Sequence, residues 1–313
     1  MDSSEVYHIK QQFILGAYPA LTAIPLPDPS SPDYVPAVLY KARAHLALGD
    51  SASVFTVVPN DSENVAFRAV TALARGDDGL EALRDLCVEI EAEDQDVGQW
   101  EREMVRTLAA TAFTRAGEIE EALETLGDAA NAGDETSAVL SQIYLSLSRP
   151  TLAQKVLSSA LRVNPDALVL QVAEAAISLV TGAQGTSEPY ASAVSFYTEQ
   201  LANPSVSSAA LLVGRGVVRI LRGELAAARS DLEEAEAILT RTKSEQAMGE
   251  VLAAMTVAIG LGAGKRGEVD EVWSRLSTEH PSHPMVMDVN AKAELFDSCA
   301  AKFSVPPRAV AAA

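Results

Sequence analysis

The stretch that decides the fold runs from Glu135 to Asp166 and reads ETSAVLSQIYLSLSRPTLAQKVLSSALRVNPD. Its small and large apolar residues recur at helical spacing in two blocks: Leu140, Ser141 and Tyr144, then Ala153, Leu157 and Ala160. Pro150 stands where a second helix would begin, and Pro165 stands where that helix would end. Ser148 occupies the turn between the two helices, where Gly is more usual. The stretch therefore predicts two short antiparallel helices that cross at small side chains.

The same turn and second helix return elsewhere in the chain. The copies are GEIEEAL from Gly117, GELAAA from Gly223 and GEVDEV from Gly267. Two antiparallel helices in about 34 residues are the tetratricopeptide unit, and about seven such turns can be counted. One hairpin cannot bury its apolar face alone, whereas stacked hairpins can. We therefore predict an all-α protein, an α-solenoid of tetratricopeptide-like helical hairpins that forms a curved superhelix.

Some segments depart from the repeat. The β-prone run Val54–Val58 suits either a short β-hairpin insertion or an ordinary second helix. Arg215 and Arg219 occupy apolar positions of a first helix, so the register of that helix must differ from the ideal. We expect a single solenoid over residues 1–304 and a disordered tail over residues 305–313, which contain two prolines and no periodicity.

The charge of the chain limits its partners. The 24 Lys and Arg residues face 43 Asp and Glu residues, which gives a net charge of −19. A field of this sign repels nucleic-acid backbones and acidic lipid headgroups, so we expect no nucleic-acid binding and membrane contact only through a complex. The acidic, polar start of the chain is unlike a secretory signal, and its two cysteines are expected to be reduced in the cytoplasm.

Motifs that would indicate catalysis have simpler interpretations. Gly262–Gly267 matches G-x-G-x-x-G, but it follows a segment of helical spacing, so we interpret it as a turn between two helices. His280 and His283 are interrupted by prolines and are expected to be surface loop residues, not metal ligands. We therefore predict no enzymatic activity, no cofactor and no metal site.

The predicted function is to hold another protein in the groove lined by the first helices. Extrapolating the repeat places eight apolar residues there: Leu39, Leu46, Leu145, Val172, Leu179, Val213, Val217 and Ile220. Val257 continues this lining, and Arg43 is its basic exception. A groove with so little positive charge does not favour binding of a peptide carboxylate. It favours a folded or helical partner in a stable complex.

Four blocks, in order, resemble the epsilon subunit of coatomer. They are FILGAY at 13–18, VLYKARA at 38–44, LQVAEAAISLVTG at 170–182 and NAKAELFD at 290–297. The resemblance implies a structural subunit of the coatomer vesicle coat that has no catalytic activity and no cofactor. It also implies that the curved inner surface binds the C-terminal domain of the coatomer alpha subunit, with other coatomer subunits contacted indirectly.

The same resemblance implies a place in the cell. The expected process is Golgi-to-ER retrograde and intra-Golgi transport. The expected location is cytoplasmic, peripheral on Golgi membranes and coated vesicles. The alternative from the repeat alone is a general tetratricopeptide adaptor that binds peptide segments of other proteins.

Overall fold

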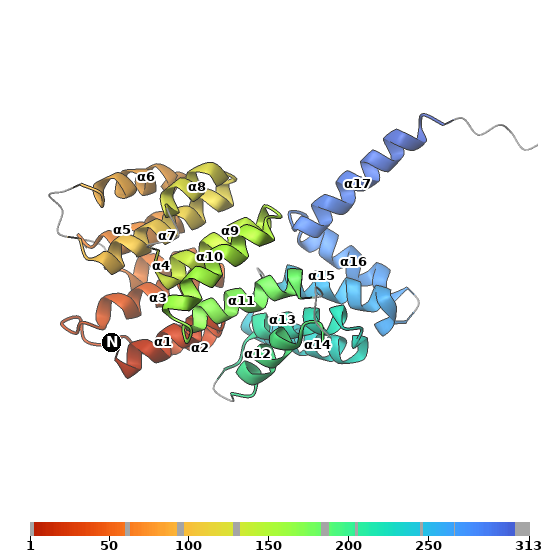
Figure 1. Cartoon of the computed structure of the whole chain (residues 1–313), viewed down its shortest axis with the longest axis horizontal. Coiled ribbons are helices and arrows are strands. Elements are labelled where there is room, and N and C mark those ends of the chain that lie inside the picture. The colour runs from red at the N-terminus through yellow and green to blue at the C-terminus, as the bar shows by residue number, and fades with distance from the viewer. Residues whose placement is uncertain are drawn as a thin grey trace, which may run out of the picture.

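The computed structural model describes residues 3–59, 63–92, 97–127, 132–182, 188–203, 206–244, 247–265 and 267–303. All regular structure within these ranges is helical, which confirms the predicted all-α class. Figure 1 shows the helices stacked in chain order along a curved path. The predicted tail at residues 305–313 lies outside the described residues.

The helices before the middle of the chain are α1 (Ser4–Ile14), α2 (Tyr18–Ala23), α3 (Tyr34–Ala47), α4 (Ser51–Val57), α5 (Val65–Ala74), η1 (Gly76–Gly79), α6 (Leu80–Glu89), α7 (Gln99–Ala116), α8 (Ile119–Leu126), α9 (Asp134–Ser146) and α10 (Pro150–Val163). Those after it are α11 (Leu168–Thr181), α12 (Ala191–Leu201), α13 (Ala209–Leu221), α14 (Leu225–Thr242), α15 (Met248–Ala258), η3 (Ile259–Ala263), α16 (Glu268–Glu279) and α17 (Pro284–Ala300). In the described residues, the α-helices from α3 to α16 pair in chain order into hairpins. Before them, α1 and α2 form the N-terminal hairpin, and α17 follows them without a second helix.

The turn inside a hairpin is built from one left-handed residue. At Gly117 φ is +83°, and the next amide, of Glu118, donates to the carbonyl of Phe113 at 2.8 Å. Ser148 has the same conformation with φ +57°, and the amide that follows it donates to Tyr144 O at 2.8 Å. This hydrogen bond, from an amide to the carbonyl five residues earlier, closes the carboxyl end of the first helix at the point where the chain reverses. Ser148 therefore takes the place of the usual Gly, as the sequence predicts.

Small residues mark the crossing within the hairpin of α9 and α10. Ala153 is fully buried, and its carbonyl accepts a hydrogen bond from Ser141 Oγ at 3.4 Å. The backbones approach this closely because neither residue has a long side chain. The crossing that the sequence places at Ser141 and Ala153 is therefore present.

The hairpin of α13 and α14 explains two arginines at apolar positions. Arg215 Nη2 and Arg219 Nη1 lie 2.8 Å and 2.6 Å from the carboxylate of Asp231 on α14. The Asp231 side chain is only 4% exposed. Gly216 is the small residue where α13 approaches α14, because a Cβ there would lie only 3.0 Å from the Leu232 side chain. The register of α13 thus departs from the ideal repeat so that an ion pair can form between its two helices.

The β-prone run near Val54 is helical. Asp50 caps α4 by accepting a hydrogen bond from the Ser53 amide at 3.1 Å, and Val54 is fully buried against the neighbouring helices. The β-hairpin alternative is therefore wrong, and the ordinary second helix is correct. Burial of Val54 in the helical stack outweighs the weak preference of Val for strands.

The N-terminal hairpin returns to the middle of the superhelix. Leu15 and Ala17 lie in one core cluster with Ala175 of α11 and Leu211 of α13. A Cβ on Gly16 would lie 3.2 Å from Ala210, which shows how closely the two segments approach. Figure 1 shows α1 beside α11. The first hairpin therefore contacts helices that are far from it in sequence.

Candidate interaction surface

The predicted groove residues of the N-terminal half lie mainly in the core. Leu39 has no exposed surface and Leu46 is 9% exposed, and both pack in the cluster that joins α3 to its neighbours. They were expected on the inner surface because a tetratricopeptide register was extended from later hairpins. In the isolated chain Leu39 offers no surface to a partner and Leu46 offers very little, and this part of the predicted lining is corrected to core.

The other predicted residues are half-buried and fall into separate clusters. Leu145 packs in the cluster around α9, α10 and α11. Val172 and Leu179 pack against the cluster that contains the N-terminal hairpin, so part of their surface is covered by the chain itself. Val213, Val217 and Ile220 pack against the cluster of α13, α14 and α15. Contact of these six residues with a partner stays a prediction.

A row of apolar side chains in the C-terminal half is accessible. Each lies near the carboxyl end of a first helix or just beyond it: Val180 on α11, Leu221 on α13, Val257 on α15 and Leu261 in η3. Their exposed fractions are 59%, 44%, 38% and 60%. Consecutive first helices are neighbours, so their carboxyl ends fall at one edge of the solenoid. We call these four residues the C-terminal apolar row.

Three members of this row were missed by sequence reasoning. Val257 was predicted, but Val180, Leu221 and Leu261 look like ordinary apolar residues of their helices. The signal that could have found them is position, because each comes within two residues of the end of its helix or in the turn that follows. An apolar side chain so close to a turn has little of its own hairpin left to cover it.

Arg43, the basic residue expected in the groove, is used inside the fold. Its Nη1 donates to Glu135 Oε2 at 2.8 Å, and its guanidinium lies 4.4 Å from the centre of the Phe13 ring. The Tyr40 hydroxyl donates to the other oxygen of the same carboxylate. Burial alone would raise the pKa of Glu135, but the Arg43 charge and the Tyr40 hydrogen bond outweigh it and hold that pKa below its usual value. Arg43 therefore joins α3 to α9 and is not placed to clamp a peptide carboxylate.

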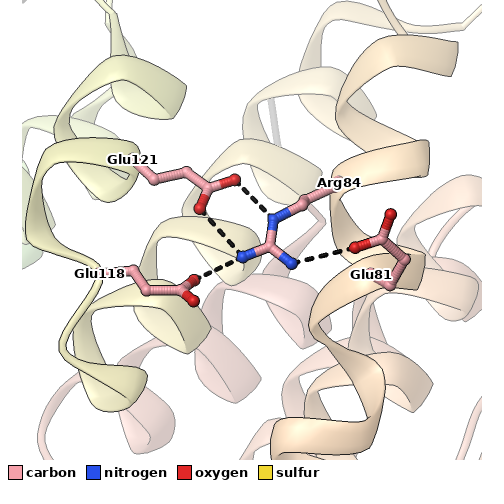
Figure 2. A network of polar contacts seen from close by, with 4 residues as sticks. All are labelled: Glu81, Arg84, Glu118 and Glu121. Carbon is pink, nitrogen blue, oxygen red and sulfur yellow. Dashed lines mark hydrogen bonds and ion pairs between the residues drawn. The ribbon is translucent and has the colours of Figure 1, made fainter.

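A second arginine joins two successive hairpins at the surface. Figure 2 shows Arg84 of α6 between Glu81, Glu118 and Glu121, with N–O distances of 3.1, 2.7 and 2.7 Å. The hydrogen bonds from Arg84 lower the pKa of the Glu121 carboxyl. The guanidinium also lies 5.4 Å from the ring centre of Phe113. Glu121 is thus part of the contact between the two hairpins, and the geometry of this contact is that of an ion pair.

The motifs interpreted as non-catalytic lie in structural positions. Gly262 is in the π-helical turn η3 with φ +128°, between α15 and α16, so the glycine-rich motif is a turn between two helices. His283 differs from the expected surface position, because its side chain is 12% exposed and its Nδ1 accepts from the Met285 amide at the start of α17. Burial raises the pKa of the Cys87 thiol to about 11, so this thiol stays protonated.

Two further features of the described residues concern ions and membranes. No group of three or more His, Cys, Asp or Glu side chains in the ranges given above is arranged to hold a metal ion. Among the helices of the same ranges, none is long and apolar enough to cross a membrane.

Together these features define a class: a helical-repeat scaffold whose accessible apolar surface lies on stacked hairpins. Comparison with known proteins gives the family. A family model described as coatomer epsilon subunit matches residues 2–304. The chain therefore belongs to the coatomer epsilon subunit family. It is a structural subunit of a vesicle coat, and the family is not one of enzymes.

Three relatives match this chain along nearly their whole length. A probable coatomer subunit epsilon of Schizosaccharomyces pombe is 27% identical, and the match covers 96% of each chain. Coatomer subunit epsilon of Caenorhabditis elegans is 25% identical, over 95% of this chain and 98% of that one. Coatomer subunit epsilon-1 of Arabidopsis thaliana is 23% identical, over 96% of this chain and 97% of that one.

Proposed function

We propose that this chain binds the C-terminal domain of the coatomer alpha subunit through the curved inner surface of its solenoid. In this role it serves Golgi-to-ER retrograde and intra-Golgi transport, as a peripheral protein on the cytoplasmic side of Golgi membranes and coated vesicles. The observation that carries the proposal is the family match over residues 2–304, on a helical-repeat fold that offers an apolar surface to another protein.

The character of the surface supports a large folded partner. The C-terminal apolar row is exposed on neighbouring first helices, and Val213, Val217 and Ile220 of α13 are half-buried against the core beneath. Interfaces of permanent complexes are more apolar than transient ones and commonly exceed about 2,000 Å². A short peptide would cover only part of such a surface. The ion pair between Arg43 and Glu135 also argues against a general adaptor that binds peptide carboxylates, because this arginine is already used inside the fold.

The test is isothermal titration calorimetry of the purified chain with the C-terminal domain of the alpha subunit. Val257→Glu places a charge in the predicted lining on a first helix, where the side chain is 38% exposed. Leu152→Glu is the matched control, because Leu152 is 42% exposed but lies on the second helix α10. We expect Val257→Glu to weaken binding about tenfold or more and Leu152→Glu to leave it unchanged.

The salt dependence separates this proposal from the adaptor. An apolar interface should bind almost equally at low and high salt, whereas a contact made by charges weakens as salt screens them. No heat of binding at micromolar concentration would contradict the proposal. An equal effect of the two variants would contradict the assignment of the inner surface.

A further inference from the structure

A cavity of about 540 Å³ lies at one end of the last two hairpins. It is lined by the end of α14, the start of the segment that leads to α15, the first residue of α15 and the end of α16. None of the predicted groove residues lines it. Pockets that hold small ligands commonly have volumes of roughly 300–1,000 Å³. The size of this cavity therefore suits a ligand larger than a simple ion.

One hydroxyl group in the wall of the cavity is buried without a partner. Ser244 is 4% exposed and lines the cavity. Its amide donates to the carbonyl of Leu239 at 3.1 Å, but its hydroxyl bonds to no described residue. Buried polar groups normally have a hydrogen-bond partner, because leaving one without a partner costs free energy. A ligand that carries a hydrogen-bond acceptor would satisfy this hydroxyl.

Two basic side chains in the same wall are also without partners. Lys243 is exposed at the end of α14, with its backbone in the left-handed region at φ +54°, and its ammonium pairs with no described acid. His280 is half-buried, and a Cβ on Gly249 of α15 would lie 3.3 Å from its ring. The nitrogens of that ring bond to no described residue. Both side chains therefore have hydrogen-bonding capacity left for a ligand.

An arginine in the wall is only partly used by its neighbours. Nη1 of Arg275 donates to Glu236 of α14 at 2.9 Å, and Nε lies 3.7 Å from Glu279, the one described acid that lines the cavity. The remaining nitrogen, Nη2, has no described partner. Because these two carboxylates offset the charge of Arg275, Lys243 supplies the positive charge that is left over. The cavity thus carries free donors and an unpaired cation in a chain of net charge −19.

The rest of the wall is apolar. Leu239 is 6% exposed and Met248 is half-buried, and both pack with the cluster of α13, α14 and α15. The flexible Met side chain can adapt to the shape of a ligand. A ligand that fits the whole cavity therefore has an apolar body beside an acceptor-rich anionic group.

The number of free donors distinguishes two kinds of anion. A carboxylate has two oxygens and a single charge, whereas a phosphate monoester has three acceptor oxygens and a charge of about −1.5 to −2 at pH 7. The free donors are the hydroxyl of Ser244, the ammonium of Lys243 and Nη2 of Arg275, with the ring of His280 beside them. Three donors besides the imidazole match the three oxygens of a phosphate better than the two of a carboxylate.

We propose that this cavity binds an organic phosphate monoester. Its phosphate accepts hydrogen bonds from Ser244, Lys243 and Arg275, and its apolar body packs on Leu239 and Met248. The phosphate belongs either to a free small molecule or to a phosphorylated side chain of another protein. This site goes beyond the proposed function, because α14 and α16 are second helices and the proposed inner surface is formed by first helices.

The experiment is isothermal titration calorimetry of the full chain with phenyl phosphate, inorganic phosphate and benzoate. Inorganic phosphate lacks the apolar body, and benzoate replaces the phosphate with a carboxylate. We expect phenyl phosphate to bind at least about tenfold more tightly than either. Lys243→Gln should weaken binding of phenyl phosphate about tenfold. The matched control is Lys155→Gln, an exposed lysine of the second helix α10 without an ion pair to a described residue, which should leave binding unchanged.

Ser244→Ala separates binding of the ligand from stability of the fold. Removing the hydroxyl should weaken binding of phenyl phosphate about fivefold. Because this hydroxyl has no partner in the free chain, its removal should leave the urea midpoint unchanged or raise it. A lower midpoint would show that the hydroxyl is bonded within the fold, and it would contradict the proposal.

The source of the phosphate is identified by competition. A short peptide with phosphoserine beside leucine should displace phenyl phosphate if the phosphate comes from a protein. If it comes from a free small molecule, the peptide should fail to displace it. Both results keep the cavity as a phosphate site.

Three results would each overturn the proposal. The first is benzoate or inorganic phosphate binding as tightly as phenyl phosphate. The second is no heat from phenyl phosphate at millimolar concentration. The third is Lys243→Gln binding phenyl phosphate as well as Lys155→Gln does. Because no alpha subunit is present, these results are independent of the calorimetry described above.

Discussion

Replacing Ser148 with glycine should stabilise the chain, although it removes a side chain. Ser148 has φ +57°, in the left-handed region. There a residue with a Cβ is destabilised by about 1–2 kcal/mol. Glycine removes this strain but gains freedom in the unfolded chain, which costs about 0.4–1 kcal/mol. The difference predicts a net stabilisation of about 0.5–1 kcal/mol.

Gly117→Ser provides the reverse experiment. Gly117 has φ +83°, and a Cβ built there would meet no atom within 4 Å, so the backbone conformation alone decides the cost. We expect a loss of about 0.5–1 kcal/mol, by the same arithmetic with the sign reversed. Ser146→Gly, two residues before Ser148 but inside α9, is the control and should destabilise by about 0.5 kcal/mol.

The assay is urea unfolding followed by far-ultraviolet circular dichroism. Ser148→Gly should raise the midpoint, and both Gly117→Ser and Ser146→Gly should lower it, with the slope of the transition unchanged. The reasoning would be refuted if Ser148→Gly destabilised the chain as Ser146→Gly does. That outcome would mean that Ser148 is not in the left-handed turn conformation that repeats through the solenoid.

Further predictions concern the packing between helices and the buried carboxylates. Ala153→Arg should overpack the crossing of α9 and α10 and cost about 1–3 kcal/mol or more, seen as a lower urea midpoint; an unchanged midpoint would mean that the crossing lies elsewhere. Asp231→Asn should cost about 3 kcal/mol, because Arg215 and Arg219 lose their partner in a mostly buried site; a change under about 0.5 kcal/mol would show that the pair is solvated. The lowered pKa of Glu135 predicts stability that is present above the carboxyl's unfolded pKa and is lost as pH falls through its folded pKa. Unfolding midpoints measured from neutral pH downward should therefore fall more steeply in the wild type than in Glu135→Gln, and equal slopes would contradict the assignment.

Local patterns carried much of the fold prediction. The turn signatures at Gly117 and Gly223 and the small residues Ser141 and Ala153 depend on neighbours within one hairpin, and the structure has them in place. Their physical causes are short-range, since a left-handed turn and a helix crossing are set by residues close in sequence. The run around Val54 was ambiguous because its residues favour strands locally. Burial of Val54 in the helical stack, which the sequence does not show, decides in favour of a helix.

Contacts between distant segments could not be read in the same way. Glu135 and Arg43 lie 92 residues apart, and nothing in either segment specifies that they meet. The return of Leu15 to α11 and α13 depends on the sum of small rotations between hairpins. The burial of Leu39 follows from the same stacking, so a register extended from later hairpins placed it on the wrong side.

The exposure of candidate surface residues was only partly predictable from the sequence. An apolar, uncharged lining was expected; Val257 is accessible, and its contact with a partner stays a prediction. The exposure of α17 was not foreseen, because Phe296 at helical spacing looks the same in a sequence whether or not a helix covers it. The order of the helices in the structure shows that no described helix follows α17 to cover it.

The measurement that tests the central claim most directly is the mass of the complex with the alpha subunit. The purified chain and the isolated C-terminal domain of the alpha subunit would be mixed at micromolar concentration and passed through size exclusion with light scattering. The account predicts one peak with the summed mass of one copy of each protein, unchanged at high salt. Two separate peaks with the masses of the isolated proteins would contradict it.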